Sequence, residues 1–570
     1  MSVGKIIGNM IKQKINLLCM ILILCTVNCI CRAQQLPPIN RSLQLTGNFG
    51  ELRTNHFHTG LDFRASIGTP VCAIDSGYVS RISVDAGGYG NALYITHPSG
   101  VTSVYAHLNS FAPNIEKKVV EQQYNLQYYA VNLTFSPNEI KVALGEVVAY
   151  TGNRGSSGGP HLHFEIRDTK TENPIEPLTY IKDKVSDTRS PQIKAISVLP
   201  HNGLVNGNNN KFICPVTADK GGKKITSKIK AWGDIVLAVK AYDYMNGMSN
   251  IYGVHYVNLY EDDELIYSSH IDTLSFAKGR QINTYIDREE WIKNRSLFML
   301  SYLSPGNTLN FYEENKIKNR GVVTINEERI YKFRYEVIDF YGNKDELLFD
   351  IEGVCSNLPE ISDKVSYNNE YIVEEDKFIM KIPAYALYDD YLPKYLKTDT
   401  IIEGNYSVIH TMEPYYIGVD KNCKLSIKID ADTIADKTKY YIASINSEGK
   451  NKGKVSGQYI SSYNEGWLTT NVKTFGKFVV KADLTKPFLK YHGVIERELR
   501  FTVKDEESGL RYFKGEIDGQ FVLFTYDIKD KIARYKIDEN KFKPSERHKI
   551  KFYAIDNCGN KKEYIGSFVF

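Results

Sequence analysis

The chain has 570 residues, which is too many for one hydrophobic core, so several domains are expected. It contains 40 Tyr, 25 Phe and 41 Gly, and this mixture of aromatic and turn-forming residues favours strands over helices. The formal net charge is +4, and residues 1–33 hold four basic and no acidic residues, so the remainder sums to 4 − 4 = 0. A neutral chain argues against a polybasic nucleic-acid binder and against a membrane-surface binder.

Residues 1–33 have the layout of a secretory signal peptide. Three lysines precede an uncharged, mostly apolar run over residues 15–31, and Ala33 supplies the small residue of a cleavage point. An uncleaved membrane anchor is the alternative, since the run is almost long enough to span a bilayer. No other stretch is apolar enough to cross a membrane, so we expect no membrane span once the signal is removed. The chain is therefore predicted to be exported, to the periplasm, the cell envelope or the medium.

Residues 34–185 are predicted to form one β-rich domain. Short apolar runs such as GTPVCAIDSGYVSRISV and VTSVYAHL alternate with glycine-containing turns. An insertion at about 113–140 interrupts the pattern. Within it, IEKKVVEQQY has a rough helical periodicity, which predicts a helix.

The remainder divides into three predicted β-rich modules, over residues 186–355, 356–483 and 484–570. The first and last end alike, in YEVIDFYGNKDEL and FYAIDNCGNKKEY, each an aromatic-rich strand that runs into a Gly-Asn turn. A second echo pairs the sequence around Asp243 with that around Asp505. Such repetition indicates tandem Ig-like β-sandwich modules, although residues 356–483 carry neither echo. The predicted fold class is mainly β, an N-terminal antiparallel sheet followed by these modules.

Histidines gather in the first third of the chain. The segment GGPHLHFEIRD alternates apolar and polar residues from Leu162 to Ile166, which predicts a strand that presents His161 and His163 on one face. In HFHTGLDF, His58 and Asp62 are four residues apart and share a face if the segment is extended. Two imidazoles and one carboxylate suit Zn²⁺ and leave a fourth position for water. The residues alone predict His58, Asp62 and one of the two later histidines as ligands.

Histidines outside the ligand set could act as a general base or stabilise an oxyanion. His56 forms a second H-x-H with His58 and is a rival ligand, but we interpret it as a groove residue. His97 precedes Pro98 at a turn and is interpreted as structural. The five cysteines after residue 33 are widely spaced, and their odd number predicts at least one free thiol.

Taken in order, HxxxD, YAHL and GPHLHFEI resemble the pattern of the lysostaphin/LytM-type zinc endopeptidases, metallopeptidase family 23. The resemblance covers about residues 47–178. It implies an antiparallel sheet with a groove walled by loops, one Zn²⁺ per chain, and cleavage of peptides in peptidoglycan.

The resemblance also implies roles for individual residues. The zinc ligands would be His58, Asp62 and His163, and the catalytic pair would be His107 and His161. None of these five positions is lost in this chain.

The predicted function is that of an exported zinc endopeptidase that hydrolyses peptide bonds in peptidoglycan cross-links or stem peptides through a metal-activated water. The alternative is a non-catalytic cell-wall-binding or regulatory protein on the same scaffold. The three later modules show no metal constellation and no nucleophile–base pair, so we expect them to position the enzyme or to bind an envelope protein partner.

Overall fold

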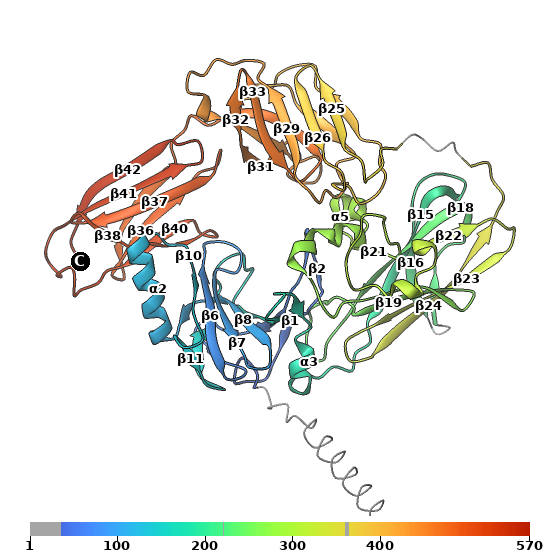
Figure 1. Ribbon diagram of the computed structural model, residues 1–570, viewed down its shortest axis with the longest axis horizontal. Helices are drawn as coiled ribbons and strands as arrows, with labels where there is room; N and C mark the ends of the chain where they lie inside the picture. The colour runs from blue at the N-terminus through green and yellow to red at the C-terminus, as the bar shows by residue number, and fades with distance from the viewer. Residues whose placement is uncertain (1–35, 220–221, 359–363) are drawn as a thin grey trace, which may run out of the picture.

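The fold is described from a computed structural model, which covers residues 36–219, 222–358 and 364–570. The predicted signal peptide over residues 1–33 lies outside the described residues. Among the helices that are described, none is long and apolar enough to cross a membrane. The chain is mainly β, as predicted, with an N-terminal sheet followed by further β-rich regions (Figure 1).

The N-terminal region is built on a nine-stranded sheet with the order β1-β4-β13-β8-β7-β6-β10, in which β11 also pairs with β6 and β14 with β13. Every pairing is antiparallel. The strands are β1 (Leu45–Gly47), β4 (Leu61–Arg64), β6 (Gly77–Val84), β7 (Asn91–Thr96), β8 (Val101–Leu108), β10 (Val131–Thr134), β11 (Lys141–Val142), β13 (His161–Asp168) and β14 (Pro174–Ile175). Two smaller sheets contain β5 (Pro70–Cys72), β9 (Ser110–Phe111) and β12 (Val147–Tyr150), and β2 (Leu52–Arg53) and β3 (His56–Phe57).

Two expectations about local structure are confirmed here. The segment around HLHFEI is strand β13, which lies between β4 and β8 in the middle of the sheet. The insertion forms helix α2 (Pro113–Leu126), which buries Ile115 and Val119, one turn apart. Pro113 stands at the start of this helix, where its missing N–H costs nothing. After the helix, β10 extends the edge of the sheet beside β6.

Residues 186–355 form one continuous ten-stranded sheet, where two separate sheets were expected. The 14-residue strand β18 (Ile229–Tyr242) explains the difference. One edge of it pairs with β15, and the other pairs in succession with β24, β22 and β21. The other strands are β15 (Gln192–Val205), β16 (Phe212–Asp219), β17 (Gly222–Ile225), β19 (Tyr256–Glu261), β20 (Glu264–His270), β21 (Met299–Leu300), β22 (Val322–Ile325), β23 (Ile330–Ile338) and β24 (Lys344–Gly353).

Short helices connect this region to its neighbours. They are α3 (Leu178–Ile181), η1 (Lys182–Lys184), η2 (Phe276–Gln281), α4 (Ile282–Tyr285), α5 (Arg288–Asn294), η3 (Glu314–Lys316) and η4 (Asn319–Gly321). The ring of Phe57 packs against Tyr285 and Phe311, with centroids 6.1 and 5.5 Å apart. The N-terminal region and residues 186–355 consequently share one continuous hydrophobic core.

Residues 364–483 and 484–570 each form two facing sheets around a core of their own. In the first region, one sheet contains β25 (Tyr371–Glu375), β26 (Phe378–Ile382), β29 (Cys423–Lys428), β33 (Trp467–Val472) and β32 (Ser462–Asn464). The facing sheet contains β27 (Lys394–Lys397), β28 (His410–Glu413), β34 (Gly476–Ala482), β30 (Tyr440–Ile445) and β31 (Val455–Ile460). The short helix η5 (Lys437–Lys439) precedes β30. The second region contains β35 (Phe488–Ile495), β36 (Glu498–Lys504), β40 (Ile532–Lys536) and β39 (Thr525–Asp527), facing β38 (Gln520–Val522), β37 (Leu510–Ile517), β41 (His548–Asp556) and β42 (Lys561–Phe568).

The four regions follow one another around a closed circuit, so that the C-terminal region returns to the N-terminal one (Figure 1). Helix α2 and the residues after it make the closing contact. Tyr128 stacks on Tyr512 with ring centroids 5.9 Å apart, and Tyr124 packs edge-on against Phe521 at 5.6 Å. A cavity of about 390 Å³ lies in this interface. The insertion is thus the surface on which the last region docks.

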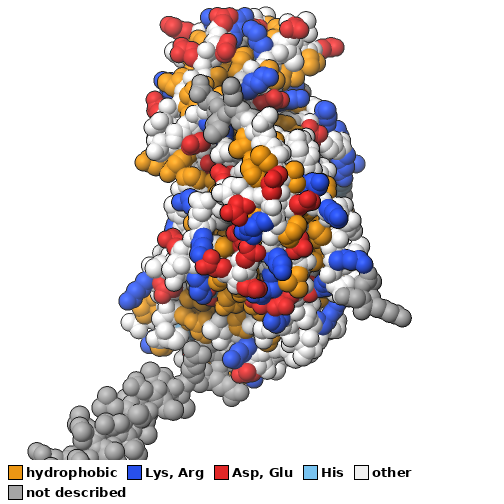
Figure 2. Space-filling view, turned by 90° about the vertical axis from the view of Figure 1, so that its right-hand side faces the viewer, with side chains coloured by type: hydrophobic (Ala, Val, Ile, Leu, Met, Phe, Trp, Pro, Cys, Tyr) orange, Lys and Arg blue, Asp and Glu red, His pale blue; other side chains and the backbone are white. Residues whose placement is uncertain are grey.

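Charged side chains of both signs are intermixed on the face seen in Figure 2. Lys and Arg alternate with Asp and Glu there, and apolar side chains are scattered between them. This agrees with a net charge near zero after residue 33. The five cysteines at positions 72, 214, 355, 423 and 558 are free thiols.

Candidate metal centre and cleft

Neighbouring strands bring the predicted metal ligands together. Asp62 on β4 and His163 on β13 are directly paired across the ladder, so their side chains project from the same face. His161 lies two residues earlier on β13 and shares that face. His58 lies in the connection between β3 and β4. The structure therefore gathers the histidines and the aspartate of the HxxxD and HLH motifs on one patch of the sheet.

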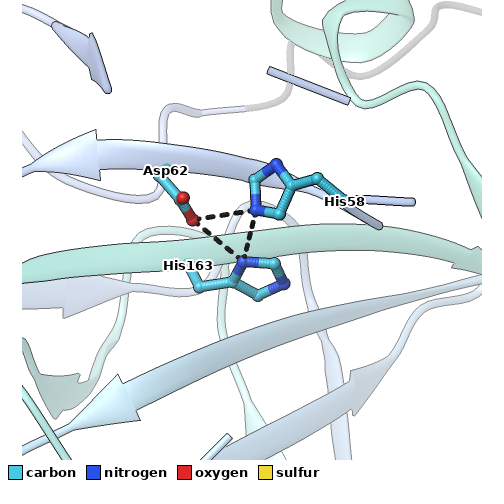
Figure 3. Close-up of side chains that lie close together, drawn as sticks. All are labelled: His58, Asp62 and His163. Carbon is cyan, nitrogen blue, oxygen red and sulfur yellow. Dashed lines mark hydrogen bonds and ion pairs between the residues drawn. The ribbon is translucent and has the colours of Figure 1, made fainter. Parts of the chain in front are cut away.

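The donor atoms of His58, Asp62 and His163 converge (Figure 3). His58 Nε2 lies 3.1 Å from Asp62 Oδ1 and 3.1 Å from His163 Nδ1, and the latter lies 2.9 Å from Asp62 Oδ1. Two imidazole nitrogens and one carboxylate oxygen around one point form the kind of donor set that binds a transition metal such as zinc.

The second nitrogen of each imidazole is held by an acceptor. His58 Nδ1 donates to the carbonyl of Asn48 at 2.7 Å, and His163 Nε2 donates to Glu165 Oε1 at 2.9 Å. In the neutral form of each ring, these bonds leave the lone pair on His58 Nε2 and on His163 Nδ1, directed toward the shared point. Acceptors of this type orient histidine ligands in metalloproteins and raise their basicity.

Asn48 and Glu165 were not predicted from the sequence. Asn48 is itself fixed by residues 186–355, because its side-chain amide exchanges two hydrogen bonds with the backbone of Gly253, at 2.8 and 2.9 Å. For Glu165 a signal existed, since His161, His163 and Glu165 alternate along one strand and must share a face. From that strand, only the two histidines were predicted as site residues.

Glu165 is fully buried and completely paired. Its carboxylate accepts hydrogen bonds from Thr59 and Tyr89, both at 2.6 Å, and from Arg167 Nε at 2.6 Å. Burial alone would raise the pKa of Glu165, but the Arg167 guanidinium and His163 outweigh burial and lower the pKa to about 2. Glu165 is therefore a fixed negative charge behind His163.

The electrostatics of the centre favour a positive charge at the shared point. Burial opposes the charged form of Asp62, but the neighbouring His58 and the hydrogen bonds from three histidines hold its pKa far below the usual range. Burial also opposes the charged form of His163, yet its bonds to Asp62 and Glu165 raise its pKa to about 9. A divalent cation would satisfy the same two carboxylates, so the residues present fit a bound metal.

His107 and His161 lie side by side next to this centre, with ring centroids 4.8 Å apart. His107 Nδ1 donates to the carbonyl of Arg154 and His161 Nδ1 to the carbonyl of Gly159, both at 2.8 Å. This leaves Nε2 of each ring to face the centre, where His161 Nε2 lies 3.4 Å from Asp62 Oδ1. Burial, followed by the neighbouring histidines, lowers the pKa of His107 to about 3, so this imidazole is neutral.

The two remaining histidines of the first third behave differently. His56 is exposed on the rim, and its Nδ1 donates to the carbonyl of Thr54. His97 is buried away from the cleft and bonds to the carbonyl of Ser76 and to Ser103 Oγ. Neither shares the convergence point of the three ligands.

The centre lies in a cleft of about 760 Å³ whose walls come from two regions of the chain. One wall is the glycine-containing loop with Ser156, Ser157 and Gly158. The opposite wall includes Leu274, Phe276 and Arg280, which lie in or next to η2. The sequence did not predict a wall from residues 186–355. This cleft can accept an extended peptide with its backbone next to the histidines.

Known proteins are similar to the N-terminal part of the chain. The model of peptidase family M23 matches residues 56–126, which include His58, Asp62 and His107. A curated relative, DD-carboxypeptidase/endopeptidase Mpg of Neisseria meningitidis serogroup B, is 37% identical over 125 residues. The N-terminal β-rich region is a peptidase family M23 domain. The alignment covers 22% of this chain and 23% of that relative, so the chain spans about a quarter of the curated proteins it matches.

Further relatives and solved structures are similar to part of the chain. Lysostaphin of Staphylococcus staphylolyticus is 27% identical over 128 residues, 22% of each protein. A zinc-containing peptidase from Vibrio cholerae is 27% identical and covers 25% of this chain and 39% of its own, with a TM-score of 0.19. Outside the M23 domain, residues 362–483 match the model of the Zu5-like domain.

Proposed function

We propose that this chain is an exported zinc endopeptidase that hydrolyses peptide bonds in peptidoglycan cross-links or stem peptides. The observation that carries the proposal is the convergence of His58 Nε2, Asp62 Oδ1 and His163 Nδ1 beside a second pair of histidines in an open cleft. The name of the Neisseria relative, a carboxypeptidase and endopeptidase, supports a peptide substrate. The signal-like residues 1–33 support export.

His58, Asp62 and His163 would hold one Zn²⁺. A zinc ion with three protein ligands supplies Lewis-acid chemistry, since it polarises a peptide carbonyl and acidifies a water molecule. Asn48 and Glu165 orient the two imidazole ligands, and Arg167 keeps Glu165 charged. These six residues would therefore set the position and the charge of the metal centre.

His107 and His161 would carry out the proton transfers. Each has Nδ1 bound to a backbone carbonyl, which fixes the ring and leaves Nε2 as the nitrogen for proton transfer. A neutral imidazole can take a proton from the attacking water and pass one to the leaving amine, or donate a hydrogen bond to the developing oxyanion. The pair lies beside the metal ligands, as these roles require.

Digestion of purified peptidoglycan with the mature chain tests the proposal. We expect soluble muropeptides with newly formed amino and carboxyl termini, identified by mass spectrometry. Treatment with 1,10-phenanthroline should stop their release, and added Zn²⁺ should restore it. A zinc-loaded, folded chain that binds peptidoglycan but releases no peptide would instead support the non-catalytic wall-binding alternative.

The cleft wall contributed by residues 186–355 predicts a binding defect in one variant. The exposed ring of Phe276 lies 4.3 Å from the Arg167 guanidinium carbon at the edge of the cleft. Phe276→Ala should raise KM about tenfold, because it removes apolar contact area, and should leave zinc content unchanged. Ile330→Ala, at an equally exposed position on β23 outside the cleft, is the matched control. An unchanged KM for Phe276→Ala would exclude this wall from substrate binding.

A further inference from the structure

Three buried aspartates meet at the junction between the M23 domain and residues 186–355. Asp187 precedes β15, Asp243 follows β18, and Asp339 follows β23. A carboxylate oxygen from each lies within 4.8 Å of the others. The side chains are only 7%, 5% and 2% exposed, so three negative groups share one small, nearly dry volume. None of them belongs to the catalytic cleft.

Protein groups satisfy the carboxylate oxygens of this cluster only in part. Asp187 Oδ2 and Asp243 Oδ1 are buried atoms without a hydrogen-bond partner. Within the part of the chain that the structure describes, none of the three carboxylates forms an ion pair with Lys, Arg or His. The nearby Arg189 points its Nη1 at the carbonyls of Met245 and Met248. Unpaired buried carboxylate oxygens are strongly unfavourable unless a cation binds them or the carboxyl group takes up a proton.

The same arrangement recurs in the last region. Carboxylate oxygens of Asp483, Asp505 and Asp556 also lie within 4.8 Å of one another. Asp483 precedes Pro487 by four residues, as Asp187 precedes a proline by four. The two repeated strand ends noted in the sequence thus bring equivalent aspartates together, and both clusters lie where one region joins the next.

The turns behind the two clusters are also the same. Asn343 donates its backbone and side-chain N–H groups to Asp339 at 2.8 and 2.7 Å, and Asn560 donates in the same way to Asp556, both at 2.8 Å. The clusters differ in one respect. Both oxygens of Asp483 accept hydrogen bonds from backbone N–H groups, at 3.0 and 3.1 Å, whereas the first cluster retains its two unpartnered oxygens.

We propose that Asp187, Asp243 and Asp339 bind one Ca²⁺ ion. Calcium takes six to eight oxygen ligands in flexible geometry, and three carboxylates supply the hard, negative donors that it prefers. Zinc is a poorer match because the cluster offers no nitrogen or sulfur donor. Magnesium is also a poorer match, since it is usually bound by one or two carboxylates and keeps several waters.

The ion would fasten the segment that links the M23 domain to the next region. Several bonds already tie this segment, among them those from Tyr341 Oη to the carbonyl of Val185 at 2.9 Å and from Asn343 Nδ2 to the carbonyl of Asp187. Coordination by Asp187 would add a further tie and join it to the ends of β18 and β23. The same region supplies the Phe276 wall of the cleft and holds Asn48, so the ion would stabilise the position of both.

Calcium titration of the full-length, zinc-loaded chain tests the proposal, with bound calcium measured by calorimetry and by metal analysis after dialysis. Asp243→Asn keeps the size of the side chain and removes its charge, and it should lose one equivalent of bound Ca²⁺ relative to the wild type. Asp350→Asn, at an exposed position on β24 of the same sheet, is the matched control and should bind as the wild type does. A hundredfold excess of Ca²⁺ over Kd should raise the melting temperature of the wild type by roughly 5–10 °C. The gain should be smaller in Asp243→Asn.

Three outcomes would overturn the proposal. They are a wild-type chain that binds no Ca²⁺, one that binds Mg²⁺ in preference at equal concentration, and an Asp243→Asn chain that binds as many equivalents as the wild type. If Asp243→Asn fails to fold, as judged by circular dichroism and zinc content, Asp339→Asn replaces it. The wild-type stoichiometry remains decisive in either case.

Discussion

Alanine at His58, Asp62 or His163 is expected to remove zinc and to abolish peptide hydrolysis. Each replacement takes away one of three protein ligands, and a site with two ligands holds zinc far more weakly. Metal analysis after dialysis should find less than about a tenth of the wild-type zinc in each variant. Activity on soluble peptides and on peptidoglycan should disappear with the metal.

Two further variants make this result specific. Glu165→Gln leaves all three ligands in place but weakens the orientation of His163, so its zinc affinity should fall by about 10- to 100-fold. His492→Ala, at an exposed histidine of the last region, should retain full zinc and activity. Unchanged zinc stoichiometry in the three ligand variants would refute the assignment of the metal site.

The second large effect is expected from His107→Ala and His161→Ala, which should keep zinc and lose turnover. In the proposed mechanism both histidines act on the transition state, so their removal should lower kcat by about 10²- to 10⁴-fold with the metal still bound. Single-turnover rates at saturating substrate, measured together with zinc content, separate this loss from a loss of metal.

His56→Ala is the control for the catalytic pair. His56 lines the same cleft, but its ring bonds to the carbonyl of Thr54 and lies outside the ligand group. The His56→Ala variant should therefore turn over substrate at nearly the wild-type rate. Wild-type hydrolysis by either His107→Ala or His161→Ala would remove that residue from the mechanism.

Much of the metal centre was predictable because it depends on side-chain alternation. The pattern of HLHFEI placed His161 and His163 on one face, and the four-residue spacing placed His58 near Asp62. Residue patterns alone left open which of the two later histidines is the ligand. The ladder register, in which His163 is opposite Asp62, favours His163 and agrees with the family resemblance.

The parts that could not be predicted depend on contacts between distant segments. Leu274 to Arg280 carry no motif, and tertiary contacts such as the packing of Phe57 against Tyr285 bring η2 to the cleft. Asn48 likewise shows its role only through its bonds to Gly253, about two hundred residues away. A positioning or partner-binding role was predicted for the regions after residue 185, and the structure adds that the first of them lines part of the cleft.

The closed arrangement of the four regions lowers the affinity that the contact between the C-terminal region and the M23 domain needs in order to stay formed. Tyr512 and Phe521 of the C-terminal region pack against the insertion of the M23 domain. Lys529 of the same region donates to the carbonyl of Gly155, in the loop before His161. Because both partners belong to one chain, each meets the other at a high effective concentration, of millimolar order for tethered partners. A contact too weak to hold two separate proteins together can therefore stay formed here. A C-terminal region separated from the rest of the chain would meet the M23 domain only in an ordinary bimolecular encounter, and the loop before His161 would lose its outer support.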